Sequence, residues 1–378
     1  MSNENNERDF YFSFAYTDIF GVEKIENIKQ YFGSLQNAWQ AEKEAWNNFK
    51  KSTIEKYFSF KNSFSLEQTK KYLSENDIKF SLFIDQDYPE NLKNISYPPP
   101  VIFYLGNLGI TEQQKDFSLA IVGSRKTSPY GEKVLEDLIN GLDNRFLIVS
   151  GLALGTDANA HRKALQRKIK TGAVLGGPIE KNHISCPISN YWLAKEILAD
   201  GGFILSEFPP NTPIHKSNFP RRNRIIAGLC KGTLVIEAGE KSGALKTAEY
   251  AKDANRVVMA VPGSIYGELS IGTNNLLKDH VDLISDSGDI FNCLGLKTQK
   301  SIVSASDKQV EIIKNAKIAG GTAGEIIIKS LILLNKIANT DEISAISQLD
   351  TPCVHSTLTI LELSGIIRRN RDGQFLLV

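Results

Sequence analysis

Apolar residues between about residue 98 and residue 295 gather in short runs that are aliphatic or β-branched at every position rather than at alternate ones. Strands with this pattern are buried on both faces, as in a parallel sheet that helices cover on either side. Stretches with helical periodicity separate the runs, so the order predicts a doubly wound α/β sheet. The predicted strands are 118–122, 146–150, 171–175, 203–206, 233–237, 257–261 and 281–284, and the predicted helices are 130–142, 157–168, 189–199, 220–230 and 243–254.

The two flanks have different patterns. Residues 1–97 are helical over 22–46 and 65–76 and end at three consecutive prolines, which mark a domain boundary. A polar stretch over 296–308 predicts a linker. The last segment, 309–378, predicts a winged helix, because four helices precede a hairpin with its turn at Arg371, Asp372 and Gly373. These helices are predicted over 310–318, 323–334, 340–347 and 351–364.

Composition narrows the class of protein. A hydrophobic content of 42% and a charged content of 23% are ordinary for a soluble globular chain. The first ten residues are polar and acidic, unlike a signal peptide, and no apolar run is long enough to span a membrane. The cysteines Cys186, Cys230, Cys293 and Cys353 lie far apart without a CxxC motif, which argues against disulfides or a zinc site and favours the cytoplasm.

Positive charge is concentrated between His215 and Arg224, although the whole chain has a formal net charge of only +1. This segment contains Lys216, Arg221, Arg222 and Arg224, no acidic residue, and Phe219 among the cations. Guanidinium groups around an aromatic ring suit single-stranded nucleic acid, whose bases can stack. Since Pro220 can occupy a first helical turn, we expect solvent-facing arginines there. For the arginines the alternative is a solvated basic face, and for Phe219 the alternative is a place in the core.

Glycine-containing loops follow three predicted strands, at Gly123, Gly151 and Gly176. The carboxyl ends of parallel strands meet at one edge of a sheet, so these loops should converge on a phosphate-accepting crevice. Arg125 follows the first loop. In a fourth loop, Ser242 can cap a helix while Lys241 reaches a phosphate.

Three acidic or basic side chains near these loops allow both a chemical and a structural interpretation. Asp157 and His161, one helical turn apart, could act as an acid–base pair, but helix capping also explains Asp157. For Glu237 we favour a buried ion pair with neighbouring arginines over a role as a catalytic base.

Six motifs, in this order, resemble the DNA-processing protein A (DprA/Smf) family over residues 118–285: VGSRKTSPYG, SGLALGTDANAH, SEFPPNTP, FPRRNRIIAGL, VIEAGEKSGALKTA and AVPGS. The first segment is similar to the family's SAM-like, degenerate helix-hairpin-helix domain, and the tail to its winged helix. The resemblance implies an extended Rossmann fold, a homodimer without enzymatic activity or cofactor, and binding of single-stranded DNA in natural transformation. It also implies a second partner, the recombinase RecA, which the family helps load onto incoming strands.

The family's DNA contacts fall, motif by motif, on Arg125, Lys216, Phe219, Arg222, Asn223 and Lys241. The loop from Gly177 to Pro187 departs from the family pattern, with Cys186 where a tyrosine is common, so no contact is carried over from it. Glu23 stands where the family's hairpin usually has a glycine.

Two other functions remain open at this stage. A nucleotide phosphoribohydrolase of the lysine-decarboxylase-like type has a similar fold, but the PGGxGTxxE motif of that class is absent here. A duplex-binding regulator would need a basic reading helix, and residues 351–364 contain no lysine or arginine.

Overall fold

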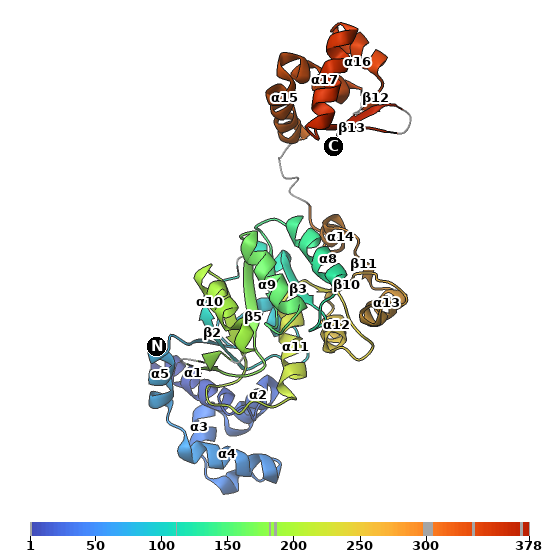
Figure 1. Ribbon diagram of the computed structural model, residues 1–378. Helices are drawn as coiled ribbons and strands as arrows, with labels where there is room; N and C mark the ends of the chain where they lie inside the picture. Colours follow the sequence, from blue (N-terminus) through green and yellow to red (C-terminus); the bar gives the residue numbers. More distant parts are fainter. Residues whose placement is uncertain are drawn as a thin grey trace. The chain divides into compact units, whose positions relative to one another are not determined.

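The computed structural model describes residues 2–110, 112–180, 183–184, 187–297, 305–334, 337–370 and 373–377. The chain folds into two compact units, Met1–Lys297 and Thr298–Val378 (Figure 1). The larger unit contains the nine-stranded sheet and the helical N-terminal region, and the smaller unit is the C-terminal region.

The sheet of the larger unit has the strand order β1-β2-β8-β5-β4-β3-β9-β10-β11. From β8 to β11 all neighbours are parallel, whereas β1 and β2 join antiparallel at one edge. The strands are β1 (Lys79–Leu82), β2 (Val101–Gly106), β8 (Phe203–Ser206), β5 (Lys170–Val174), β4 (Leu147–Ser150), β3 (Ser118–Val122), β9 (Gly232–Val235), β10 (Val257–Ala260) and β11 (Asp282–Leu283).

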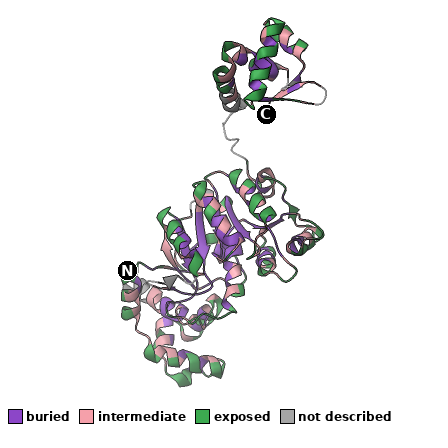
Figure 2. Cartoon of the chain, viewed as in Figure 1, coloured by how far each residue is buried: buried purple, intermediate pink, exposed green. Residues whose placement is uncertain are grey.

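Helices cover both faces of this sheet. One face packs α8 (Pro129–Asn140), α9 (Thr156–Gln166) and α14 (Ser287–Cys293) around residues such as Leu135 and Phe291. The opposite face packs α6 (Glu90–Lys93), α11 (Asn218–Leu229), α12 (Gly243–Asp253) and α13 (Ile271–Lys278). Every residue of β3, β4 and β9 is buried, and the exposed positions lie on the outer helices (Figure 2). The predicted α/β sheet is confirmed, because its central strands are aliphatic on both faces.

The helical N-terminal region contains α1 (Ser2–Ala15), α2 (Val22–Phe32), α3 (Leu35–Gln40), the 3-10 helix η1 (Lys43–Trp46), α4 (Lys51–Ser63) and α5 (Leu66–Glu75). The single helix expected over 22–46 is divided, because Gly33 ends α2 with a φ of 79° and Ser34 caps α3. Its apolar core continues onto the sheet through Phe103, and β1, which precedes the three prolines, pairs with β2 beyond them.

The smaller unit contains α15 (Ala305–Leu333), α16 (Thr340–Ser347) and α17 (Thr351–Leu363), together with an antiparallel sheet of order β12-β14-β13 whose first strand lies between α15 and α16. Its strands are β12 (Ile337–Ala338), β13 (Ile367–Arg369) and β14 (Phe375–Leu377). Non-helical backbone at Gly320 and Gly321 divides α15 between the two helices predicted over 310–318 and 323–334. Arg371 and Asp372, predicted as a turn, and 298–304 of the predicted linker lie outside the described residues.

The remaining elements are short connections: α7 (Glu112–Asp116), β6 (Ile179–Glu180), β7 (His183–Ile184), η2 (Ile188–Asn190) and η3 (Glu268–Ser270), with α10 (Tyr191–Ala199) packed on β5 and β8.

Candidate nucleic-acid interface

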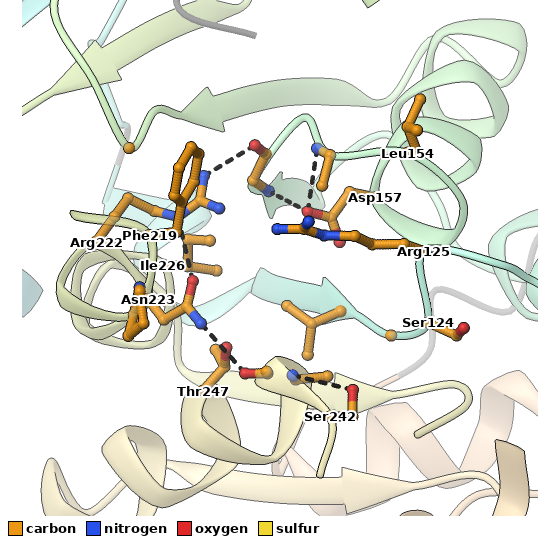
Figure 3. A pocket seen from close by; sticks show the side chains of 18 of the residues that line it. Ser124, Arg125, Leu154, Asp157, Phe219, Arg222, Asn223, Ile226, Ser242 and Thr247 are labelled. Carbon is orange, nitrogen blue, oxygen red and sulfur yellow. Dashed lines mark hydrogen bonds between the residues drawn. The ribbon is translucent and has the colours of Figure 1, made fainter. Parts of the chain in front are cut away.

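A cavity of about 1000 Å³ lies at the carboxyl ends of β3, β4, β5 and β9. Its wall includes Gly123 after β3, Gly151 after β4 and Gly176 after β5, together with the loop before α12 and the first turns of α11 (Figure 3). The three glycine loops therefore converge as the sequence predicts. In the sheet, β3 lies between β4 and β9. The helix after β3 covers one face of the sheet and the helix after β9 covers the other, so the loops after these two neighbouring strands diverge and open a crevice.

All six residues predicted as DNA contacts line this cavity. They come from the loop after β3, from α11 with the turn before it, and from the loop between β9 and α12: Arg125, Lys216, Phe219, Arg222, Asn223 and Lys241. The fold thus brings together residues that are 116 positions apart in the chain, since Arg125 follows β3 and Lys241 follows the neighbouring strand β9. Their contact with DNA stays a prediction.

Three of the six are exposed cations: Arg125, Lys216 and Lys241. Within the described part of the chain, their charged groups form no hydrogen bond and no ion pair. Positive charges held around one cavity without internal partners favour an anionic ligand, and a cavity wall of low polarity strengthens their field.

Arg222 does not face solvent, although the sequence predicts solvent-facing arginines at the start of this helix. Only 5% of the residue is exposed, and its Nη1 donates hydrogen bonds to the carbonyl oxygens of Gly151, at 2.8 Å, and Val174. A Cβ on Gly151 would lie 2.4 Å from Nη2, so the glycine makes room for the guanidinium. Burial lowers the pKa of Arg222 to about 10, while the nearby Asp157 opposes this shift. Arg222 therefore fastens the ends of β4 and β5 together.

Asp157 holds the loop that precedes its own helix. Its carboxylate accepts hydrogen bonds from the backbone N–H groups of Gly151, at 3.1 Å, and Ala153, at 3.3 Å. Burial raises the pKa of this carboxyl, and the charge of Arg222 opposes the shift. The role of Asp157 is therefore structural, but the capping interpretation is wrong, because the N-cap of α9 is Gly155 and the amides that Asp157 binds belong to the loop.

His161 does not form an acid–base pair with Asp157. Its ring is fully buried, and Nδ1 lies 2.7 Å from the hydroxyl oxygen of Thr171 on β5. Burial lowers the pKa of His161 to about 3, which keeps the ring neutral. One helical turn separates the two residues in sequence, but the ring points into the core.

The other two arginines of the basic segment are neutralised. Glu207, whose side chain is 1% exposed, pairs with Arg221 at 2.9 Å and with Arg224 at 2.7 Å. Asp18, in the turn between α1 and α2, also pairs with Arg221 at 2.7 Å. The sequence gives no local sign of these pairs, because both acids lie outside the segment. The free positive surface is consequently smaller than the segment suggests.

Phe219 is half-buried and flanks the cavity. Its ring packs on the backbone after β5, where a Cβ on Gly176 would lie 2.7 Å from Cδ1 (Figure 3). The ring is thus held in place without being enclosed. Asn223 accepts a hydrogen bond from Arg222 Nε and donates one to the carbonyl of Gly243, both at 3.2 Å, which connects α11 to α12.

Glu237 does not pair with arginine, contrary to expectation. It accepts hydrogen bonds from the backbone and hydroxyl of Ser128, at the start of α8. Ser242 caps α12 as predicted, with its hydroxyl 3.3 Å from the N–H of Ala244. The sequence reasoning missed the apolar wall formed by Leu154, Pro187 and Ile214, which lie in loops without periodicity. Cys186 lies outside the described residues.

Over the described ranges, no helix is long and apolar enough to cross a membrane. Nor do the side chains described there include a cluster of histidine, cysteine, aspartate or glutamate that could hold a metal ion.

Comparison with known proteins gives a consistent result. The model of the DNA recombination-mediator protein A family matches residues 79–295. Protein Smf of Synechocystis is 32% identical over 392 residues, covering 96% of this chain and 97% of that protein. DNA processing protein DprA of Streptococcus pneumoniae is 39% identical over 238 residues, covering 63% and 80%.

Two solved structures are similar as well. The X-ray structure of DNA processing protein A from Streptococcus pneumoniae has a TM-score of 0.62 at 32% identity, and the match covers 75% of this chain and 97% of that one. DNA processing protein A from Helicobacter pylori, solved for its single-stranded DNA binding mode, has a TM-score of 0.50 at 27% identity, covering 57% and 95%.

Proposed function

This chain belongs to the DNA recombination-mediator protein A family, and from that premise we propose that it binds single-stranded DNA in the cavity at the carboxyl ends of β3, β4, β5 and β9. One observation carries the proposal: three cations with free charged groups line the same cavity as the half-buried ring of Phe219. An exposed backbone of phosphates with unpaired bases is the ligand that such a combination fits.

The six cavity residues divide into two roles in this proposal. Arg125, Lys216 and Lys241 contact phosphates, and Phe219 stacks on a base. Arg222 and Asn223 act instead as positioning residues, since their hydrogen bonds fasten β4, β5 and α12 to α11.

We propose binding without bond cleavage. The three side chains considered as catalytic acids or bases have structural roles instead. Asp157 accepts hydrogen bonds from loop amides, His161 is neutral and buried, and Glu237 accepts hydrogen bonds at the start of α8. Hydrolysis of a nucleotide would need a free base or nucleophile in the cavity. A phosphoribohydrolase is the alternative, and the experiment below includes an assay for it.

The wider role we propose is that of a recombination mediator in natural transformation, which loads the recombinase RecA onto the bound strand as a homodimer in the cytoplasm. Family membership supports this role. In the smaller unit, three helices and a three-stranded sheet completed by the hairpin of β13 and β14 support a winged helix. The larger unit supports an extended Rossmann fold beside a SAM-like domain. Because α17 has no lysine or arginine, we propose that this winged helix contacts protein rather than duplex DNA.

The experiment is a titration of the full chain against a labelled single strand and a blunt duplex of the same sequence. We expect tighter binding to the single strand, with affinity falling on a log–log plot against salt by about 0.7 per phosphate contacted. Equal or tighter binding to the duplex would contradict the proposal. In parallel, release of free base from nucleoside 5′-monophosphates would favour the hydrolase.

A further inference from the structure

Two aromatic side chains and a lysine form a cluster on α10, outside the cavity, in which Trp192 and Lys195 are exposed and Tyr191 is half-buried. Trp192 is 69% exposed, and Nζ of Lys195 lies 5.2 Å from the centre of its ring and 4.9 Å from the ring of Tyr191. Trp46 is buried and Trp39 half-buried, so Trp192 is the exposed tryptophan of a chain that has three. We call Tyr191, Trp192 and Lys195 the α10 platform.

The α10 platform is attached to the cavity wall. Asn190, which is 1% exposed and directly precedes α10, donates hydrogen bonds from Nδ2 to the carbonyl oxygens of Leu152, at 3.0 Å, and Ala153, at 3.1 Å. Ala153 and Leu154 belong to the cavity wall (Figure 3), and so does Pro187, just before η2. Consecutive Cα atoms are about 3.8 Å apart, so the Cα of Trp192 lies within about 7.6 Å of the Cα of Asn190, which is hydrogen-bonded to this wall.

We propose that the α10 platform is a second base-stacking site, which takes nucleotides of the single strand that leave the cavity at its Pro187 end. The inference rests on the proposed function. A cation on one side of the indole stabilises the ring's position, and the exposure of Trp192 leaves the other face open to a base. The ammonium of Lys195 then reaches the adjoining phosphate.

The chemistry of the platform favours nucleic acid over a protein partner. Stacking on an aromatic ring tolerates any base, and a lysine beside the ring complements the phosphate of the same nucleotide. A protein interface would use apolar area with charge depleted at its centre, whereas here the ammonium lies over both rings.

Oligothymidylates from about 4 to about 16 nucleotides long test the platform. Trp192→Ala should bind the shortest ones like the parent, because they fill only the cavity, and should bind the longest roughly 5- to 10-fold more weakly. Trp192→Phe should bind the longest oligonucleotides with most of the parent's affinity, because its ring can still stack on a base. Tyr97→Ala is the matched control, since Tyr97 is a 75% exposed aromatic outside the cavity wall. The melting temperature of each variant checks that the fold is intact.

Tryptophan fluorescence provides a second readout. Long oligonucleotides should quench the emission of the parent, and this quenching should disappear in Trp192→Phe, which keeps Trp39 and Trp46. If Trp192→Ala binds every length like the parent, the inference is wrong, and the platform is left for a protein partner. If the parent itself binds no single strand, the proposed function fails instead.

Discussion

At the scale of the residue, arginines of one helix occupy different environments. Arg222 is buried against backbone carbonyls, while Arg221 and Arg224 share Glu207. Only cations without internal partners, such as Lys216, are free to attract phosphate. How strongly a basic segment attracts DNA therefore depends on which of its side chains are already neutralised by other residues of the fold.

Replacing Arg222 with alanine should destabilise the fold by roughly 2–4 kcal/mol, because two buried carbonyl oxygens lose their donor. A solvent-facing residue would cost less than about 0.5 kcal/mol. Urea unfolding measures the difference. Lys216→Ala, an exposed cation of the same segment, is the control, and equal unfolding midpoints for the two variants would show that Arg222 is not a positioning residue.

Phe219→Ala should weaken binding to single-stranded DNA by about 1–3 kcal/mol, which is typical for the loss of one stacked base. The loss of stability should stay below the roughly 3–5 kcal/mol of a fully buried phenylalanine, since the ring is half-buried. A binding titration and a melting curve on the same preparation separate the two effects. A large stability loss with unchanged affinity would assign Phe219 to the core.

His161 should make the protein less stable in acid. Its pKa is about 3 in the folded chain, against about 6.5 when unfolded. Between these values the unfolded state binds the extra proton, so the stabilisation is complete above pH 6.5 and falls below it by about 1.4 kcal/mol per pH unit. Denaturation of the parent and His161→Gln from pH 7 to pH 4 checks this. The variant should lose stability less steeply, and parallel curves would contradict a neutral buried ring.

At the scale of the element, α11 connects the cavity to the N-terminal helices. Its first turns supply Phe219 to the cavity, while Arg221 reaches Asp18 in the turn after α1. The helix thus presents one side to the ligand and holds another against a separate region of the same unit.

Asp18→Asn should raise the affinity for single-stranded DNA by about 1.5- to 5-fold at low salt, because it removes a carboxylate that competes for Arg221. The cost in stability should be at most about 1 kcal/mol. Asp116→Asn is the control, since it breaks a comparable 3.0 Å pair with Lys231 outside the cavity wall. Unchanged or weaker binding by Asp18→Asn would show that Arg221 has no part in attracting DNA.

Elements buried on both faces could be predicted from the sequence, and contacts between distant segments could not. The strand over 203–206 was predicted at its observed bounds, because all four residues are apolar or small and enclosed. The cavity residues followed from the motifs and from the rule that parallel strands end at one edge. The burial of Arg222 depends on which side of α11 meets the sheet, and the pairing of Arg221 depends on Asp18, 203 positions away.

At the scale of the whole molecule, the residues of the proposed function lie at one edge of the sheet, where the parallel strands have their carboxyl ends. Loops after β3, β4, β5 and β9 supply the cavity, and the start of α10 is fastened to its wall. The opposite edge contains no residue of the proposed site. Removal of an exposed cavity cation should therefore change binding to every single strand, whatever its sequence, and should leave the fold unchanged.

The salt dependence of binding for Lys241→Ala is the most direct test of this account. Lys133→Ala is the matched control, because Lys133 is an exposed cation on α8 outside the cavity wall. Titrations with one single strand at several salt concentrations should give Lys241→Ala a lower affinity and a slope flatter than the parent's by about 0.7, while Lys133→Ala keeps the parent's slope. An affinity and slope for Lys241→Ala equal to the parent's would contradict the claim that this cavity binds the strand.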